Sequence, residues 1–156
     1  MNSVSVNKTT LQWSLLLLRL GVFLVFAMWT LDKFINPGHA AVVFEKYYKI
    51  PGMSSAFTYA VGGVQVAIIL LFASGTFRTW SYAAVTILHA VSTFSAYNQY
   101  LDPWTKPNLL FFAAFPMLAA CLALWLLREH DNMLSIDAMR NPSVEPRLST
   151  QDTITA

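Results

Sequence analysis

Charged residues are scarce in this chain. Asp, Glu, Lys and Arg make up 12% of its 156 residues, whereas 56% of the residues are hydrophobic. In soluble domains about a quarter of the residues are usually charged. The formal net charge of +2 is too small and too scattered to predict a nucleic-acid surface. We therefore expect one domain that lies in lipid, with the bilayer as a partner and no nucleic acid.

Cysteine is nearly absent as well. The single cysteine, Cys121, excludes an internal disulfide and a CxxC redox or zinc site within one chain. A b-type haem commonly takes two facing histidines, and only His89 lies in an apolar stretch; a metal site lacks inward ligands for the same reason. We expect no metal and no cofactor held by the chain alone. A quinone fits better, because it needs only an apolar slot and one or two hydrogen-bond donors.

Four long stretches contain no Asp, Glu or Lys: residues 11–31, 54–74, 79–100 and 107–127. Each is long enough to cross a bilayer, which takes about 20 helical residues. The sequence therefore predicts an all-α integral membrane protein, an antiparallel bundle of four transmembrane helices over residues 11–127. We expect a polar segment at 1–10, a polar flexible tail at 128–156, and a first helix that is retained rather than cleaved as a signal peptide.

A short helix is predicted between the first two spans. Asn36 is suited to cap it and Pro37 to occupy its first turn, and Pro51-Gly52 should end it. Apolar residues recur on one face of this segment at helical spacing, which indicates an amphipathic helix on the membrane surface. These residues are Ala40, Val43, Phe44 and Tyr47.

The basic residues favour one orientation by a small margin. Lys8, Arg78, Arg128, Arg140 and Arg147 fall on the side of the termini, and Lys33, Lys46, Lys49 and Lys106 fall on the other. Arg78 and Arg128 directly adjoin predicted spans, where positive charge has most effect on topology. We expect the termini to be cytoplasmic, in the cytoplasmic membrane of a bacterium or an archaeon.

Several polar residues lie within the predicted spans. Counted from the side of the termini, Arg19, Gln65 and His89 have nearly the same depth, about 12–15 Å at about 1.5 Å per helical residue. An arginine that faces lipid costs at least ~2.5 kcal/mol, so Arg19 should point inward. Tyr82 and Thr86 continue a polar stripe through His89. We predict that these five residues form an intramembrane polar cluster that could bind a ligand.

Plainer roles compete with ligand binding. Gln65 could serve only to join helices, and His89 could equally be a core histidine or a site residue. Arg19 could serve packing and orientation alone, although intramembrane ionisable residues are functional by default. The sequence does not identify catalytic residues.

A polar vestibule is predicted on the side away from the termini. Arg19 and Lys33 are fourteen residues apart, about four helical turns, and so share a face of the first span. Lys33 could line the vestibule together with Asp32, Asn98 and Gln99.

The order of these residues resembles the DoxX family, which includes the DoxD-type small subunit of thiosulfate:quinone oxidoreductase. The resemblance covers about residues 15–128 and implies a four-helix bundle associated with membrane redox or sulfur metabolism, frequently as a partner subunit. The family often has a glutamate at the position of Gln65, so we expect Arg19 to lack a counter-ion within this chain. The resemblance rests on Arg19-Leu20 with Lys33, the Phe44-containing helix ending at Pro51, Gly62-Gly63-x-Gln65, Leu70-Leu71, Gly75 and Arg78.

These observations favour a DoxX-like membrane subunit associated with a respiratory or sulfur-linked oxidoreductase complex, next to a quinone or a lipid-like ligand. We expect an accessory or partner subunit rather than a complete enzyme, in contact with other membrane subunits or with further copies of itself. One alternative is a stand-alone quinone-linked membrane oxidoreductase. Another is a carrier or transporter for a small molecule or a lipid.

Overall fold

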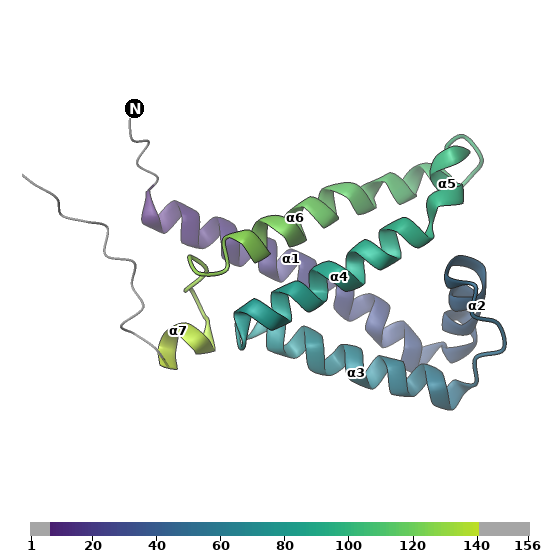
Figure 1. Ribbon diagram of the computed structural model, residues 1–156, viewed down its shortest axis with the longest axis horizontal. Coiled ribbons are helices and arrows are strands. Elements are labelled where there is room, and N and C mark those ends of the chain that lie inside the picture. Colours follow the sequence, from purple (N-terminus) through teal and green to yellow (C-terminus); the bar gives the residue numbers. More distant parts are fainter. Residues whose placement is uncertain (1–6, 141–156) are drawn as a thin grey trace, which may run out of the picture.

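The computed structural model describes residues 7–140, and all regular secondary structure among them is helical, which confirms the predicted all-α class for this part of the chain. The elements are α1 (Lys8–Ile35), α2 (Pro37–Tyr48), α3 (Ser55–Ala73), α4 (Arg78–Ser95), α5 (Tyr97–Leu101), the 3-10 helix η1 (Asn108–Ala113), α6 (Ala114–Leu126) and α7 (Ile136–Arg140) (Figure 1).

Three helical stretches of the described residues are long and apolar enough to cross a membrane: Lys8–Ile35, Ser55–Ala73 and Asn108–Leu126. They contain most or all of the predicted spans at 11–31, 54–74 and 107–127. The stretch predicted at 79–100 corresponds to α4, which has 18 residues and is less apolar, because hydroxyl groups and an imidazole occupy one of its faces. That helix ends at Ser95, and Ala96 separates it from α5.

The four long helices form a ring of contacts. Helix α1 packs against α3 and α6, and α4 packs against the same two helices. The beginning of α1, the turn between α3 and α4, and α7 lie at one end of the molecule, called here the terminal end; α2 and α5 lie at the other end (Figure 1). The buried apolar core lies between the helices and consists of Leu15, Val22, Phe26, Ile69, Phe72, Tyr82, Val85, Cys121 and Leu124.

Glycine permits the close packing of α3 on α1. A Cβ atom added at Gly62 would lie 2.8 Å from the ring of Phe34, whereas one added at Gly63 would meet nothing within 4 Å. Of the two adjacent glycines, the first is therefore the one at which a side chain would displace the Phe34 ring.

Two helix starts differ from the predictions in detail. The side chain of Asn7 accepts hydrogen bonds from the backbone of Thr9 and Thr10 and so caps α1. The last three residues of the predicted polar segment at 1–10 thus belong to the first turn of α1, and residues 1–6 lie outside the described part. Pro37 begins α2 as predicted, but the Asn36 side chain makes no capping hydrogen bond and donates to Asp32 instead.

The segment formed by residues 128–140, called here the C-terminal segment, is attached to the terminal end. The backbone N–H of Ile136 donates to the Ser74 carbonyl at 2.9 Å, and that of Asp137 donates to the Gly75 carbonyl at 3.2 Å. The prediction of a flexible tail from residue 128 is therefore wrong for residues 128–140; residues 141–156 lie outside the described part.

Candidate functional site

Arg19 is fully buried, with 0% exposure, and it pairs with an acid. Its Nη1 lies 3.4 Å from Oδ2 of Asp131, whose side chain is equally buried. The Tyr82 hydroxyl accepts a hydrogen bond from Arg19 Nη1 at 3.2 Å and donates one to Asp131 Oδ2 at 2.7 Å. These three side chains are called here the Arg19 cluster.

Backbone carbonyls of the C-terminal segment also bind the guanidinium. Arg19 Nη2 donates to the Met133 carbonyl at 2.5 Å and to the Leu134 carbonyl at 3.2 Å. Hydrogen bonds from a charged donor are stronger than neutral ones. The expectation that Arg19 lacks a counter-ion within this chain is therefore wrong, because Asp131 lies beyond the last apolar stretch and reaches back to it.

The direction of the Arg19 side chain explains its position. Helical side chains point toward the N-terminus of their helix, so the guanidinium lies nearer the terminal end than its own Cα. It reaches the turn between α3 and α4: a Cβ atom added at Gly75 would lie 2.8 Å from Arg19 Nη1 and 2.7 Å from the hydroxyl of Ser135. Gly75 has φ 63°, and its carbonyl accepts from that hydroxyl at 3.0 Å.

Gln12 forms a second attachment between α1 and the C-terminal segment. Its Oε1 accepts hydrogen bonds from the backbone N–H groups of Asn132 at 3.0 Å and Met133 at 2.9 Å, and its Nε2 donates to the His130 carbonyl. Gln12 was not among the predicted site residues. Its spacing could have indicated it, since Gln12 and Arg19 are seven residues, or about two turns, apart on one helix face.

Arg78 attaches the start of α4 to the same segment. Its Nη1 donates to the carbonyls of Arg128 and Asp131 and to Oδ1 of Asn132, each at 2.9 Å. The backbone N–H of Arg78 donates to Asp137 Oδ2 at 3.0 Å. The first N–H groups of a helix have no acceptor within the helix. Asp137, which is distant in the sequence, accepts from one of these groups in α4.

The other members of the predicted cluster lie apart from the guanidinium. His89 Nε2 lies 3.0 Å from the Ala114 carbonyl, and the Thr86 hydroxyl donates to the Tyr82 carbonyl of its own helix and contacts the Cys121 carbonyl of α6. Gln65 is half-buried, and its Oε1 has no hydrogen-bond partner among the described residues. Of the predicted companions, Tyr82 is the one that the described hydrogen bonds join to Arg19.

The predicted vestibule residues have separate partners. Lys33 Nζ donates to the Trp29 carbonyl at 3.0 Å and lies 5.9 Å from the centre of the Phe44 ring. Asp32 Oδ2 lies 2.7 Å from Nδ1 of His39, which joins α1 to α2. No hydrogen bond in the described part of the chain connects these two residues to the other vestibule residues, Asn98 and Gln99.

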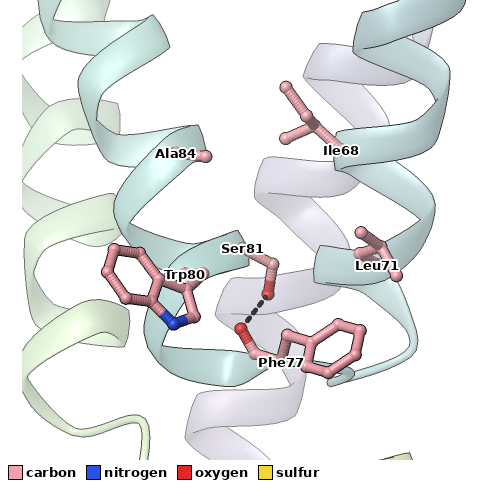
Figure 2. A pocket seen from close by; sticks show the side chains of 6 residues that line it. All are labelled: Ile68, Leu71, Phe77, Trp80, Ser81 and Ala84. Carbon is pink, nitrogen blue, oxygen red and sulfur yellow. Dashed lines mark hydrogen bonds between the residues drawn. The ribbon is translucent and has the colours of Figure 1, made fainter.

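Two hollows open near the α3–α4 turn. The first, called here the α3–α4 groove, has a volume of about 330 Å³, and Figure 2 shows its lining: Ile68, Leu71, Phe77, Trp80, Ser81 and Ala84. The second, called here the arginine pocket, has a volume of about 440 Å³ and is lined by Phe77, Arg78, Thr79, Trp80, Arg128, Glu129, Asp137 and Arg140.

The Arg19 cluster has little capacity to bind a ligand, because groups of the same chain surround it. Nη1 and Nη2 of Arg19 and the Tyr82 hydroxyl are engaged by groups of this chain, whereas Arg19 Nε and Asp131 Oδ1 are buried and have no hydrogen-bond partner among the described residues. Within residues 7–140 there is no group of three or more His, Cys, Asp or Glu side chains that could hold a metal ion. The cluster therefore acts as an internal ion pair that fastens the C-terminal segment, and the quinone stays a prediction.

No protein-family model, curated protein or solved structure matches this chain. The resemblance to the DoxX family stays a prediction. Three of the residues that carry it, Arg19, Gly75 and Arg78, nevertheless meet at the terminal end, where each contacts the C-terminal segment.

Proposed function

We propose that this protein is an accessory subunit of a membrane oxidoreductase complex, as its resemblance to the DoxX family implies, rather than a complete enzyme. The observation that carries the proposal is the apolar surface of the fastened C-terminal segment. Leu134 is 72% exposed and Met139 is 70% exposed, although the segment that bears them is held by the buried Arg19 cluster. Fixing apolar side chains outside the bundle favours contact with a partner subunit.

The proposal includes α4 as a fourth transmembrane helix of an antiparallel bundle. Five of its polar residues are turned inward: Ser81, Tyr82, Thr86, His89 and Thr93 are buried. Its exposed face carries Trp80, Ile87, Val91 and Phe94, which suits lipid contact. The modest overall hydropathy of α4 thus comes from residues that the bundle covers. We place the termini in the cytoplasm, as the basic residues next to the spans favour.

Purification of the tagged full chain from its native membrane in a mild detergent tests the function. We expect it to be recovered in a larger complex that contains a redox subunit. The double variant Leu134→Asn/Met139→Gln should lose the complex while it keeps its helical content. The matched control, Leu101→Asn/Trp104→Gln, changes equally exposed residues away from the terminal end and should retain it.

Recovery of the unaltered chain as a stable solitary monomer would refute the proposal. Turnover of a quinone analogue by the purified chain would favour the stand-alone enzyme instead. Transport of a small molecule into proteoliposomes would favour the carrier.

A further inference from the structure

The α3–α4 groove and the arginine pocket adjoin each other and differ in chemistry. Phe77 and Trp80 line both, so the two hollows share a wall. One hollow is apolar and lies between two helices, and the other contains charged groups at the terminal end. We propose that together they bind one anionic phospholipid, with the headgroup phosphate in the arginine pocket and an acyl chain in the groove.

The arginine pocket has a charge that matches a phosphodiester. Its three guanidinium groups stand against two carboxylates, which leaves one net positive charge. Arg128 Nη2 lies 3.6 Å from Glu129, and Arg78 Nε lies 4.0 Å from Asp137. No salt bridge of the described residues engages Arg140, which is exposed. Arginine binds phosphate oxygens through paired N–H groups, so Arg140 supplies the contact with the headgroup phosphate. Arg128 contributes its charge, because its Nε already donates to the Thr79 hydroxyl at 3.3 Å and its Nη1 to the Trp125 carbonyl at 2.9 Å.

The groove suits an acyl chain because its one hydroxyl is directed into the protein. Ser81 is buried, and its Oγ donates to the carbonyls of Thr76 at 2.9 Å and Phe77 at 3.2 Å. Figure 2 shows this hydroxyl pointing toward the Phe77 carbonyl, with the side chains of Ile68 and Leu71 along the facing helix. The remaining lining is apolar, as a chain of methylene groups requires.

The two aromatic residues of the shared wall mark the level of the headgroup. Trp80 is 78% exposed and Phe77 is 60% exposed; amphipathic aromatic rings such as that of Trp80 are enriched at the membrane interface. Phe77 adopts a left-handed conformation, with φ 49° and ψ 49°, which is a strained backbone for a bulky residue. Such strain is concentrated at ligand sites and switches, and here it places the ring between the two hollows.

A lipid accounts for both hollows, whereas a soluble anion would use only the pocket and a quinone would have no need of its charge. The inference does not depend on the accessory-subunit function. Its test uses the purified full chain in mild detergent. Native mass spectrometry would measure the binding of dioleoyl phosphatidylglycerol, of dioleoyl phosphatidylcholine with the same chains, and of the soluble headgroup glycerophosphoglycerol.

We expect the phosphatidylglycerol to bind about tenfold more tightly than the phosphatidylcholine. The double variant Arg128→Gln/Arg140→Gln should abolish this preference, because it weakens the binding of the anionic phosphatidylglycerol more than that of phosphatidylcholine, whose choline offsets the charge of its phosphate. The control variant Lys106→Gln removes an exposed cation that lies outside both hollows and should preserve the preference. Ala84→Leu, which fills the groove, should weaken both lipids while the circular dichroism stays that of the unaltered chain.

Equal binding of the two lipids, or a preference that survives the double arginine variant, would overturn the proposal. So would binding of glycerophosphoglycerol as tight as that of the lipid, which would indicate a site for free anions. A quinone analogue that binds more tightly than the phosphatidylglycerol and competes with it would assign the groove to a neutral ligand and equally overturn the inference.

Discussion

Replacing Asp131 by Asn removes the negative charge from the Arg19 cluster with almost no change of shape. Arg19 then remains with 0% exposure and without the carboxylate that lies 3.4 Å from its Nη1. We expect the C-terminal segment to detach from the terminal end in a large fraction of molecules, because release of that segment allows water to reach the unpaired cation.

The size of the effect follows from the partners that remain. Removing one member of a buried ion pair costs about 3–5 kcal/mol. Arg19 keeps the Tyr82 hydroxyl and two carbonyls as acceptors, and an amide oxygen can still accept from Tyr82. The cost should therefore lie near the lower limit, about 3 kcal/mol, which is roughly a hundredfold change in the equilibrium between attached and detached segment.

Hydrogen exchange measured by mass spectrometry on the full chain in lipid nanodiscs reports this equilibrium directly. The backbone N–H groups of Asn132, Met133 and Ile136 donate hydrogen bonds across the terminal end, so their exchange should accelerate by a similar factor. The control is Asp102→Asn, an exposed carboxylate whose loss should change stability by less than about 0.5 kcal/mol.

A double-mutant cycle separates the interaction energy of the ion pair from the effects of altered packing at each site. Combining Arg19→Met with Asp131→Asn leaves no unpaired charge, so the double variant should be less destabilised than the sum of the single variants. Unchanged exchange in Asp131→Asn, or strictly additive effects in the cycle, would refute the assignment of Asp131 as the counter-ion of Arg19.

Four further substitutions have defined outcomes. Gly75→Ala should lower the free energy of unfolding by at least about 1–2 kcal/mol, because φ 63° is left-handed and the new Cβ would lie 2.8 Å from Arg19; thermal unfolding in detergent measures this. Gly62→Ala should destabilise the contact of α3 with α1, whereas Gly63→Ala, which has open space around it, should be neutral or stabilising by about 0.4–1 kcal/mol in the same assay; equal effects would contradict the packing. Gln12→Leu should leave the Met133 N–H unpaired and the Asn132 N–H with only the His130 carbonyl as acceptor. We expect a cost of about 1–3 kcal/mol and faster exchange in residues 132–133, without an effect on α3.

The spans could be predicted because a membrane helix is recognisable from the apolar composition of one continuous stretch of sequence. Continuous apolar stretches fix α3 and the helix that ends at Leu126 to within about one residue at each end. The inner face of α4 was predictable for the same reason, since hydroxyl groups and His89 recur at helical spacing and were expected to point away from lipid. The short helix α2 followed from Pro37 and the apolar face behind it.

The Arg19 cluster could be predicted only in part, because its acid lies in a segment that resembles a tail. Residues 128–140 have no apolar period, and nothing local distinguishes Asp131 from an exposed aspartate. Its burial comes from long-range contacts, with Gln12, Arg78 and the carbonyl of Gly75 each binding part of the segment. Tyr82 was predicted as a polar residue of α4 but not as the group between arginine and acid.

Depth counting along the helices failed for Arg19 for a geometric reason. It located Cα atoms, and Arg19, Gln65 and His89 do lie at similar counts from the ends of their predicted spans. An arginine side chain, however, extends well beyond its Cα and points toward the N-terminus of its helix, so the guanidinium reaches the hydroxyl of Tyr82, a residue near the beginning of α4. The charge is thereby brought out of the middle of the bundle to its terminal end, where carbonyls and a carboxylate of the C-terminal segment can reach it. An intramembrane arginine near the start of a first span is thus best paired, when only a sequence is known, with acids that follow the last span as well as with acids inside the spans.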